Sequence, residues 1–422
     1  MKDKITKLIN VYKKNGLSGL IKKSTKYIKA TYIDKYNLFT LLKKKKYTCI
    51  IKKILEENKY DRIILWRSNF GYNVPLYQRP QHIANNLSKM NSLVFYEVTT
   101  MTDNILTLKE AQNNLYLFNF NNKVLNKILM SLLRNIEKPK YIEIYSTNWS
   151  LTLNELITYE KNNFKIIYEY IDHLSPELSG TSSLPKNISD KYNYMLKNKN
   201  IFVVVTADKL MTDIINKRGK TNLVLSTNGV DYNFFKEFDN YKLEESYINI
   251  INNGKINICY YGALAKWFDY ELIKKIAKTN KYNVILIGIK YDESFDENIS
   301  NEKNIYFLGP KDYKILKYYA RTCDILTIPF IINDITSSTS PLKIFEYMAL
   351  NKPIVTTNMY ECKKYSSVLI GENHIDFIKK LETAYKLKND KQYLELLNKE
   401  ALNNDWSMKA KKIIDMIKDS EK

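Results

Sequence analysis

The segment SSTSPLKIFEYMALNKPIVTT, residues 337–357, joins a serine-rich loop to the start of a helix that carries a cation. Ser340 is a residue type that favours the N-cap of a helix, and Pro341 suits a first helical position, which needs no N–H. We therefore expect a helix that begins at Pro341, with Leu342 first on its apolar face. Its first-turn N–H groups, its positive dipole end and the ammonium of Lys343 would then lie together. This arrangement suits an anion such as a diphosphate.

The end of this helix and the element after it can also be predicted. Asn351 can adopt the left-handed conformation that ends a helix, and Pro353 prevents the helix from continuing. Ile354 to Thr356 then have the composition of a short buried strand. A helix, a stop and a strand in this order are typical of a doubly wound sheet. Glu346, in the second turn, would by itself be an ordinary exposed helix residue.

The rest of the chain alternates strand and helix patterns, which predicts an α/β protein with two parallel sheets. Strands are expected at residues 62–66, 92–96, 142–145, 165–170, 201–206 and 223–226, and again at 256–261, 284–287, 305–308, 325–328 and 354–356. The polar and charged residues 236–255 are expected to form an irregular linker between the two series. We therefore predict a basic amphipathic helical extension at 1–55, domains at 56–238 and 256–402, a linker at 239–255 and, at 403–422, a C-terminal helix that returns toward the first domain.

Several stretches in order along the chain resemble one family of enzymes. Residues 337–357 resemble the C-terminal signature of retaining family-four glycosyltransferases, which have two Rossmann-like domains facing across a cleft in the GT-B fold. Residues 226–235 (STNGVDYNFF), 259–270 (CYYGALAKWFDY), 304–329 and 79–87 (RPQHIANNL) are similar to other parts of the same family. The tryptophan-containing loop and the SPLK helix start resemble a subgroup that acts on cell-surface polysaccharides and protein-linked glycans.

The resemblance implies a nucleotide-sugar site in the second domain. It assigns Glu346 to the ribose hydroxyls, because the two oxygens of a carboxylate can accept hydrogen bonds from two adjacent hydroxyls. The family's second glutamate, eight residues earlier, is replaced by Ser338. Gly262 would let backbone approach a phosphate, although a turn that needs positive φ would also explain a glycine there. Lys343 and Lys266 would replace the family's basic pair. The remaining expected donor contacts are Ser340, Pro341 and Leu342, and Lys290 is a further cation to consider.

The acceptor and catalytic groups are expected in two loops of the first domain. Asp172 and His173 follow a predicted strand, where residues are well placed for chemistry, but Asp is also a common cap or turn residue there. Arg79 and His82 are expected to contact the acceptor. A salt bridge at the helix N-terminus is an equally good interpretation of Arg79. A structural role is the stronger alternative for His82, because it lies within a predicted helix.

The positive charge of the chain is concentrated at its N-terminus. Residues 1–53 contain 16 Lys against Asp3 and Asp34, so they carry +14 of the formal +21. Apolar residues recur between these lysines at mainly helical spacing, as in a basic amphipathic helix on an anionic membrane surface. The alternative is that the apolar face packs on the protein while the lysines are solvated. Nucleic acid is not an expected partner, because no nucleic-acid motif accompanies the charge.

These patterns predict transfer of a sugar from a nucleotide sugar to a hydroxyl of a surface glycan, lipid-linked glycan or glycoprotein, with retention implied by the resemblance. No cofactor is expected, and no metal, since four dispersed cysteines and three histidines offer no zinc spacing. No signal peptide or run of ~18 apolar residues is seen, so a cytoplasmic protein, peripheral on the inner face of the plasma membrane, is expected. A non-catalytic GT-B partner subunit and a sugar-nucleotide epimerase remain alternatives.

Overall fold

The computed structural model describes residues 38–419 except 75–76, 100–101, 175–182 and 300–301, together with Ile21, Ser24 and Thr25. Most of the predicted basic extension therefore lies outside the described residues. The chain divides into two compact units, one of residues 1–74, 87–144 and 148–166, the other of residues 75–86, 145–147 and 167–422. Within the described ranges, no helix has both the length and the apolar content needed to span a bilayer.

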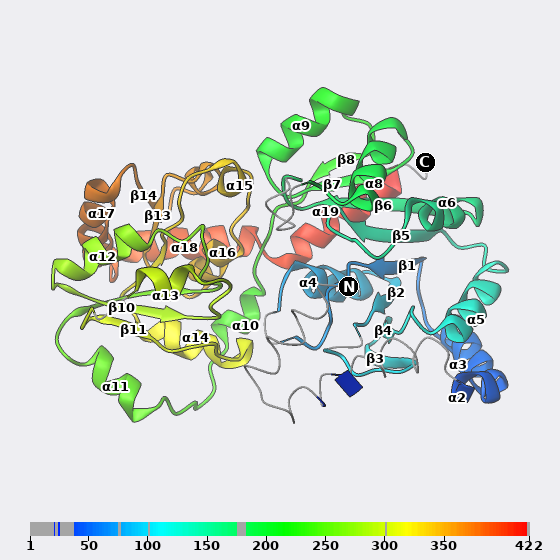
Figure 1. The fold of residues 1–422 in the computed structure, drawn as a ribbon, viewed down its shortest axis with the longest axis horizontal. Helices are drawn as coiled ribbons and strands as arrows, with labels where there is room; N and C mark the ends of the chain where they lie inside the picture. The colour runs from blue at the N-terminus through cyan, green and yellow to red at the C-terminus, as the bar shows by residue number, and fades with distance from the viewer. Residues whose placement is uncertain are drawn as a thin grey trace. The chain divides into compact units, whose positions relative to one another are not determined.

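The first sheet has eight strands in the order β3-β4-β2-β1-β5-β6-β7-β8 (Figure 1). Its strands are β1 (Arg62–Arg67), β2 (Ser92–Glu97), β3 (Leu108–Gln112), β4 (Leu115–Phe118), β5 (Lys140–Tyr145), β6 (Phe164–Tyr170), β7 (Phe202–Val205) and β8 (Leu223–Leu225). All six residues of β1 and of β2 are buried, as expected for central strands of a sheet covered on both faces. The strands predicted from the sequence are confirmed to within a few residues.

The edge of this sheet differs from the prediction of purely parallel pairing. β3 pairs antiparallel with β4, and only two residues separate the strands. Asn114 has a φ of +61°, a conformation that asparagine tolerates better than most residues, and it allows this tight connection. The three central residues of β3 are exposed, so this strand has no apolar run. Neither β3 nor β4, whose four residues are buried, was among the predicted strands.

A series of helices accompanies this sheet. They are α2 (Leu38–Leu42), α3 (Lys44–Glu57), α4 (Arg79–Lys89), α5 (Lys123–Leu133), α6 (Leu153–Lys161), α8 (Lys186–Lys197) and α9 (Asp208–Arg218). α3 packs on α5 through Ile51, Ile54 and Leu55, which are buried. The end of the basic segment is therefore helical, and this part of it has an apolar side that packs on the protein.

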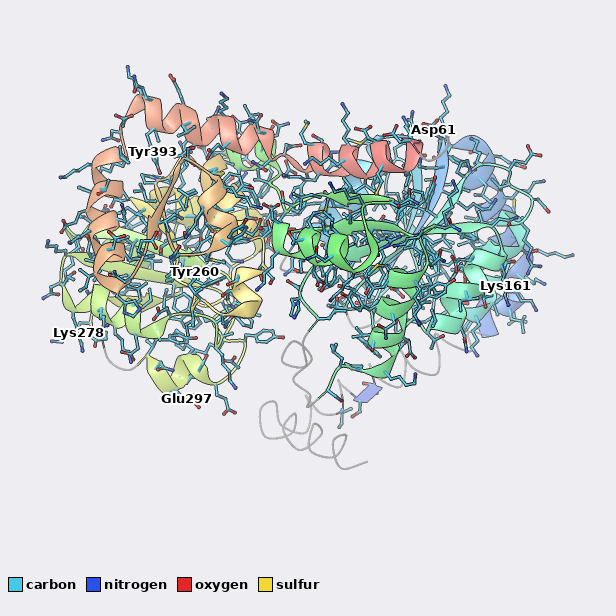
Figure 2. The ribbon with its side chains drawn as sticks, turned by 90° about the horizontal axis from the view of Figure 1, so that it is seen from above. Asp61, Lys161, Tyr260, Lys278, Glu297 and Tyr393 are labelled. Carbon is cyan, nitrogen blue, oxygen red and sulfur yellow. The ribbon has the colours of Figure 1, made fainter. Side chains whose placement is uncertain are left out.

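The second sheet has six strands in the order β11-β10-β9-β12-β13-β14, and all its pairings are parallel. Its strands are β9 (Ile256–Tyr261), β10 (Tyr282–Ile287), β11 (Ile305–Phe307), β12 (Ile325–Ile328), β13 (Ile354–Thr357) and β14 (Val368–Gly371). Its helices are α12 (Tyr270–Lys278), α13 (Ser294–Asn298), α14 (Tyr313–Thr322), α15 (Asp334–Ser337), α16 (Leu342–Ala349), η2 (Tyr360–Lys364), α17 (His374–Leu387) and α18 (Lys391–Asn403). Tyr260 lies within the core around this sheet, whereas Lys278 is exposed on α12 (Figure 2).

The segment expected to be an irregular linker contains helical structure. α10 (Tyr232–Lys236) precedes it, and α11 (Glu245–Ile251) forms inside it. Tyr247 of α11 is buried and donates a hydrogen bond of 2.9 Å to the backbone oxygen of Tyr319 in α14. The prediction was wrong here, because a short helix with one buried aromatic residue gives little periodic signal.

Both sheets reverse the direction of strand order at their first strand. From β1 the chain moves to β2 on one side and later to β5 on the other, and from β9 it moves to β10 on one side and later to β12 on the other. Because crossovers between parallel strands are right-handed, the connections on either side of such a strand run over opposite faces of the sheet. Ligands of open α/β sheets bind outside the carboxyl ends of the strands at this point.

The C-terminal helix α19 (Trp406–Asp419) packs on β7 and β8 of the first sheet. Lys412 Nζ donates to the backbone oxygen of Leu225 at 3.3 Å, and Trp406 N donates to the backbone oxygen of Val230 at 3.0 Å. The helix therefore extends the layer on the first sheet after the chain has completed the second one.

Candidate functional site

The loop after β9 holds a glycine against the side chain of Lys343. Gly262 has a φ of +150°, and a Cβ built there would lie 2.2 Å from Lys343 Cε and 2.8 Å from Tyr260 Oη. Only glycine leaves this space to the lysine. The structure thus brings together Gly262 and Lys343, two of the predicted donor residues, at the point where strand order reverses in the second sheet.

A second glycine, which the sequence analysis did not identify, makes this approach possible. Gly288 follows β10, also with a φ of +150°, and a Cβ there would lie 1.8 Å from the Gly262 carbonyl oxygen. The Gly262 N–H donates to the Ile287 carbonyl at 2.8 Å, so the two loops are hydrogen-bonded as well as closely packed. A glycine directly after a predicted strand was the signal that would have identified Gly288.

The helix at this site begins one residue later than predicted. α16 starts at Leu342, and Pro341 is its N-cap, with an extended ψ of 111° and no side-chain cap. The prediction that Ser340 caps the helix was wrong. Ser340 is buried, and its carbonyl oxygen accepts a hydrogen bond of 2.7 Å from Asn228 Nδ2. Asn228 Oδ1 is buried and has no hydrogen-bond partner among the described residues, so this side chain keeps one unused acceptor beside the helix start.

Glu346 lies one turn into α16 and is buried, with 3% of its surface exposed. Burial raises the pKa of its carboxyl group to about 7, while Lys343 and the Tyr261 hydroxyl act in the opposite direction. Burial likewise lowers the pKa of Lys343, and Glu346 partly offsets that shift. A carboxyl group and an ammonium group are thus both desolvated at the start of one helix, which is typical of binding and catalytic sites. Glu346 is not the exposed helix residue that its sequence context alone would suggest.

The other predicted cations of the donor site are placed differently. The side chain of Lys266 is exposed, and its backbone N–H donates to the Asp292 carboxylate at 3.1 Å. Lys290 forms an ion pair with Asp296 and lies 4.6 Å from the centroid of the Phe295 ring. Ser338, where the family has its second glutamate, is buried. Contact of Lys266 with a diphosphate stays a prediction.

Arg79 forms a buried, bidentate ion pair with Glu169 of β6. Its Nε and Nη2 atoms donate to the two carboxylate oxygens at 2.8 and 3.2 Å, and its Nη1 donates to the Thr227 carbonyl at 3.1 Å. These contacts give Arg79 the structural role that was its alternative interpretation. A role in binding an acceptor stays a prediction.

His82 lies in an aromatic cluster. Its ring stacks on Trp406 of α19 at 5.0 Å between centroids and meets the Tyr77 ring edge-on at 4.8 Å. The side chain is buried, so the structure supports the packing role.

Asp172 and His173 follow β6, as predicted, and both are half-buried. Burial raises the pKa of the Asp172 carboxyl group to about 7. A carboxyl group with this pKa at the carboxyl end of a parallel strand can exchange a proton near neutral pH. Their catalytic roles are not tested by the geometry and stay predictions.

Comparison with known proteins agrees with this arrangement. Residues 255–386 match the family model described as "Glycosyl transferases group 1". This part of the chain is therefore similar to group 1 glycosyl transferases, and the chain shares the GT-B fold of the solved structures described below. The resemblance seen in the sequence is thereby confirmed, and the matched domain contains Gly262, Lys343 and Glu346.

One curated relative and several solved structures are similar to the chain. A protein of Bacillus subtilis (strain 168), named as the teichuronic acid biosynthesis glycosyltransferase TuaH, is 25% identical over 268 residues, which are 59% of this chain and 66% of the relative. Sucrose-phosphate synthase from Thermosynechococcus elongatus has a TM-score of 0.59 at 12% identity, over 85% of this chain and 98% of that one. Anabaena HepE in complex with UDP has a TM-score of 0.57 at 14% identity, over 85% and 100%. At these identities the structures show a shared fold.

Replacing Arg79 by Ala should destabilise the GT-B fold by about 3–5 kcal/mol, because Glu169 would remain buried without its partner. Urea unfolding followed by circular dichroism measures the change. The control is Lys281→Ala, which removes an exposed ion pair with Glu382 and should change stability far less. Equal effects of the two variants would contradict the buried-pair interpretation.

The raised pKa of Glu346 predicts how stability changes with pH. The folded-state pKa of about 7 exceeds the reference value of 4.5, so the wild type should lose stability as pH rises from about 4.5 to 7. Glu346→Gln removes this titration. The melting temperature of the variant minus that of the wild type should therefore be larger at pH 8 than at pH 5. Glu395→Gln, on the exposed side of α18, should show no such trend. A pH-independent difference for Glu346→Gln would contradict the assignment.

Proposed function

We propose that the protein transfers a glycosyl group from a nucleotide sugar to an acceptor hydroxyl. The observation that carries this proposal is the approach of Lys343 to Gly262 at the start of α16, with Glu346 buried one turn further. The helix start and the lysine suit the diphosphate, and the carboxylate suits the ribose hydroxyls. HepE, which shares the fold, is described in complexes with UDP and UDP-glucose, so uridine is the first base to test.

The reaction breaks the bond between the anomeric carbon and the diphosphate oxygen. Negative charge develops on the leaving diphosphate while the sugar gains oxocarbenium character. Lys343 and the first-turn N–H groups of α16 would stabilise that charge without a resident cofactor. We infer that Asp172, with a pKa of about 7, takes the proton of the acceptor hydroxyl as the hydroxyl oxygen bonds the anomeric carbon. His173 lies beside it in sequence. The resemblance supports retention of the anomeric configuration.

A glycan is the proposed acceptor. The support is the name of the TuaH relative, which connects it with teichuronic acid biosynthesis, and the form of the CYYGALAKWFDY loop. The growing polysaccharide and its lipid-linked precursor are both consistent with this assignment. Binding of the acceptor to Arg79 or His82 would require these side chains to leave the packed positions described above.

Nucleotide binding tests the proposal most directly. Nucleoside diphosphates at about 100 times their dissociation constant should stabilise the fold by about 2.7 kcal/mol, which calorimetry detects as a rise in melting temperature. We expect UDP to produce this rise in the wild type, and Glu346→Ala to lose most of it. Glu395→Ala is the matched control on an exposed helix surface and should respond like the wild type.

Two outcomes would redirect the interpretation. If no nucleoside diphosphate raised the melting temperature, the enzyme proposal would fail and the non-catalytic subunit would be favoured. If UDP-sugar were bound and changed configuration with no acceptor present, the epimerase would be favoured.

The end of the basic segment also supports peripheral contact with an anionic membrane at the cytoplasmic face. In α2, Thr40 is buried and accepts a hydrogen bond of 2.9 Å from Asn122 Nδ2, which orients the helix. Phe39 and Leu42 are 70% and 81% exposed, and Lys43 to Lys46 follow them on the surface. Apolar residues beside lysines are typical of helices that lie in a membrane interface.

This contact predicts a composition-dependent attachment. The full chain should sediment with vesicles of phosphatidylglycerol and phosphatidylcholine, less at high salt, and little with phosphatidylcholine alone. Replacing Phe39 and Leu42 by Ser should reduce the bound fraction several-fold. Ile375→Ser, at a similarly exposed apolar residue of α17, should leave it unchanged. Equal sedimentation of both variants would rule out α2 as the contact.

A further inference from the structure

An exposed tryptophan lies where strand order reverses in the first sheet. Trp149, in the connection between β5 and α6, is 69% exposed, and Phe70, in the loop after β1, is 36% exposed. β1 and β5 are neighbours in the sheet and mark its reversal point. A ligand of this sheet would bind outside the carboxyl ends of these two strands. Two aromatic side chains are therefore presented at the place where the topology favours a ligand.

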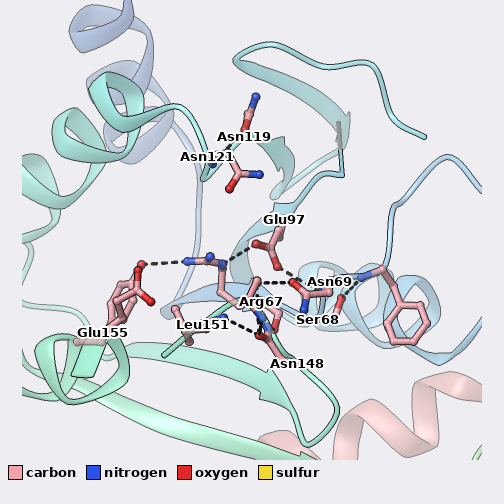
Figure 3. Close-up of polar contacts among 12 residues, drawn as sticks. Arg67, Ser68, Asn69, Glu97, Asn119, Asn121, Asn148, Leu151 and Glu155 are labelled. Carbon is pink, nitrogen blue, oxygen red and sulfur yellow. Dashed lines mark hydrogen bonds and ion pairs between the residues drawn. The ribbon is translucent and has the colours of Figure 1, made fainter. Parts of the chain in front are cut away.

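The loop that carries Trp149 is held in place on both sides of this residue. Asn148 Nδ2 donates to the Arg67 carbonyl oxygen at 2.6 Å, and Asn148 Oδ1 accepts from the N–H groups of Ser150 and Leu151 at 3.1 and 2.9 Å (Figure 3). Ser150 Oγ donates to Asn69 Oδ1 at 2.6 Å. Trp149 is thus presented from a preorganised loop, which lowers the entropy cost of binding a rigid partner.

The charged groups beneath the loop are paired with one another. Arg67 Nε donates to Glu97 Oε1 at 3.0 Å, Arg67 Nη1 donates to the Tyr159 hydroxyl at 3.3 Å, and Glu97 Oε2 accepts from the Asn69 N–H at 3.2 Å (Figure 3). Arg67 and Glu97 are both buried. The side chains of Asn69, Asn148 and Ser150, which hold the two loops together, offer neutral amide and hydroxyl groups. One of them, Asn69 Nδ2, has no hydrogen-bond acceptor among the described residues.

An exposed aromatic face with neutral polar neighbours matches the chemistry of a sugar ring. One face of a pyranose presents C–H groups, whose slight positive charge is attracted to the negative face of an indole, while its hydroxyls seek amide and hydroxyl partners. A nucleotide would instead need cations for its phosphates, and the guanidinium here is paired with Glu97. The site therefore favours an uncharged part of a glycan.

We propose that Trp149 is the stacking platform for a pyranose ring of the acceptor glycan, and this inference rests on the proposed glycosyl transfer. The acceptor would then be recognised as an oligosaccharide, at a ring beyond the reacting hydroxyl. Trp149 acts in binding, so its loss should raise the KM for acceptor more than it lowers kcat.

Isothermal calorimetry on the full chain tests this with three tetrasaccharides as probes: cellotetraose, chitotetraose and a tetrasaccharide of alternating glucuronate and N-acetylglucosamine. We expect at least one probe to bind the wild type and Trp149→Ala to weaken it about tenfold. Trp149→Phe, which keeps an aromatic face, should stay within about threefold. The control is Tyr360→Ala, at an exposed aromatic residue of η2, which should bind like the wild type.

The melting-temperature rise with UDP is measured for every variant. Trp149→Ala should keep it, which separates loss of the glycan platform from loss of the fold or of the donor site. The inference is overturned if none of the three probes binds the wild type, or if Trp149→Ala binds them as the wild type does. Failure of the proposed function has a different signature, since the wild type itself would then show no response to nucleoside diphosphates.

Discussion

The right-handed crossover between parallel strands is the constraint on which both sites depend. Because β1 and β9 are each followed by a strand on one side and later by a strand on the other, their flanking connections must leave over opposite faces. A ligand of such a sheet binds outside the carboxyl ends of the strands at this point. In the second sheet the side chain of Lys343, from α16, lies at this point. The loops after β9 and β10 pack closely on each other there through Gly262 and Gly288. In the first sheet the loops after β1 and β5 present Phe70 and Trp149 at this point, and hydrogen bonds from Asn148 and Ser150 join the two loops.

The buried charged groups described above include two kinds. Arg79 with Glu169 and Arg67 with Glu97 are paired at about 3 Å with further hydrogen bonds, so their partners satisfy them. Glu346 is different, because the described contacts include no hydrogen bond or ion pair between its carboxyl group and Lys343. Burial raises the pKa of this carboxyl group to about 7. The first kind holds loops and helices together. The second leaves desolvated charges that a ligand of complementary chemistry would stabilise.

The sequence predicted the parts of this architecture that depend on local rules. The stop at Asn351 has the expected positive φ of 53°, the strand after Pro353 forms as Ile354–Thr357, and Gly262 lies at a turn that requires glycine. The failures have physical causes as well. Ser340 is drawn into a hydrogen bond from Asn228, more than a hundred residues away, which no local pattern can indicate. β3 is an exposed edge strand without an apolar run, and Trp149 becomes notable only once β5 is known to adjoin β1.

The same reasoning explains why Arg79 and Lys343, both cations near the start of a helix, have different roles. Arg79 has a rigid, planar group that two carboxylate oxygens can match, so a buried pair with Glu169 uses its donors and fixes α4 to β6. Lys343 is a flexible point charge whose pKa is lowered by burial, and glycine at position 262 gives its side chain space. On the proposed function, the negative charge of a bound diphosphate would stabilise the ammonium form of Lys343, which burial disfavours in the free protein. Part of the binding free energy would therefore come from stabilising a group that is already desolvated. On this proposal the helix start would be preorganised for an anion, because the free-energy cost of burying Lys343 was met when the chain folded.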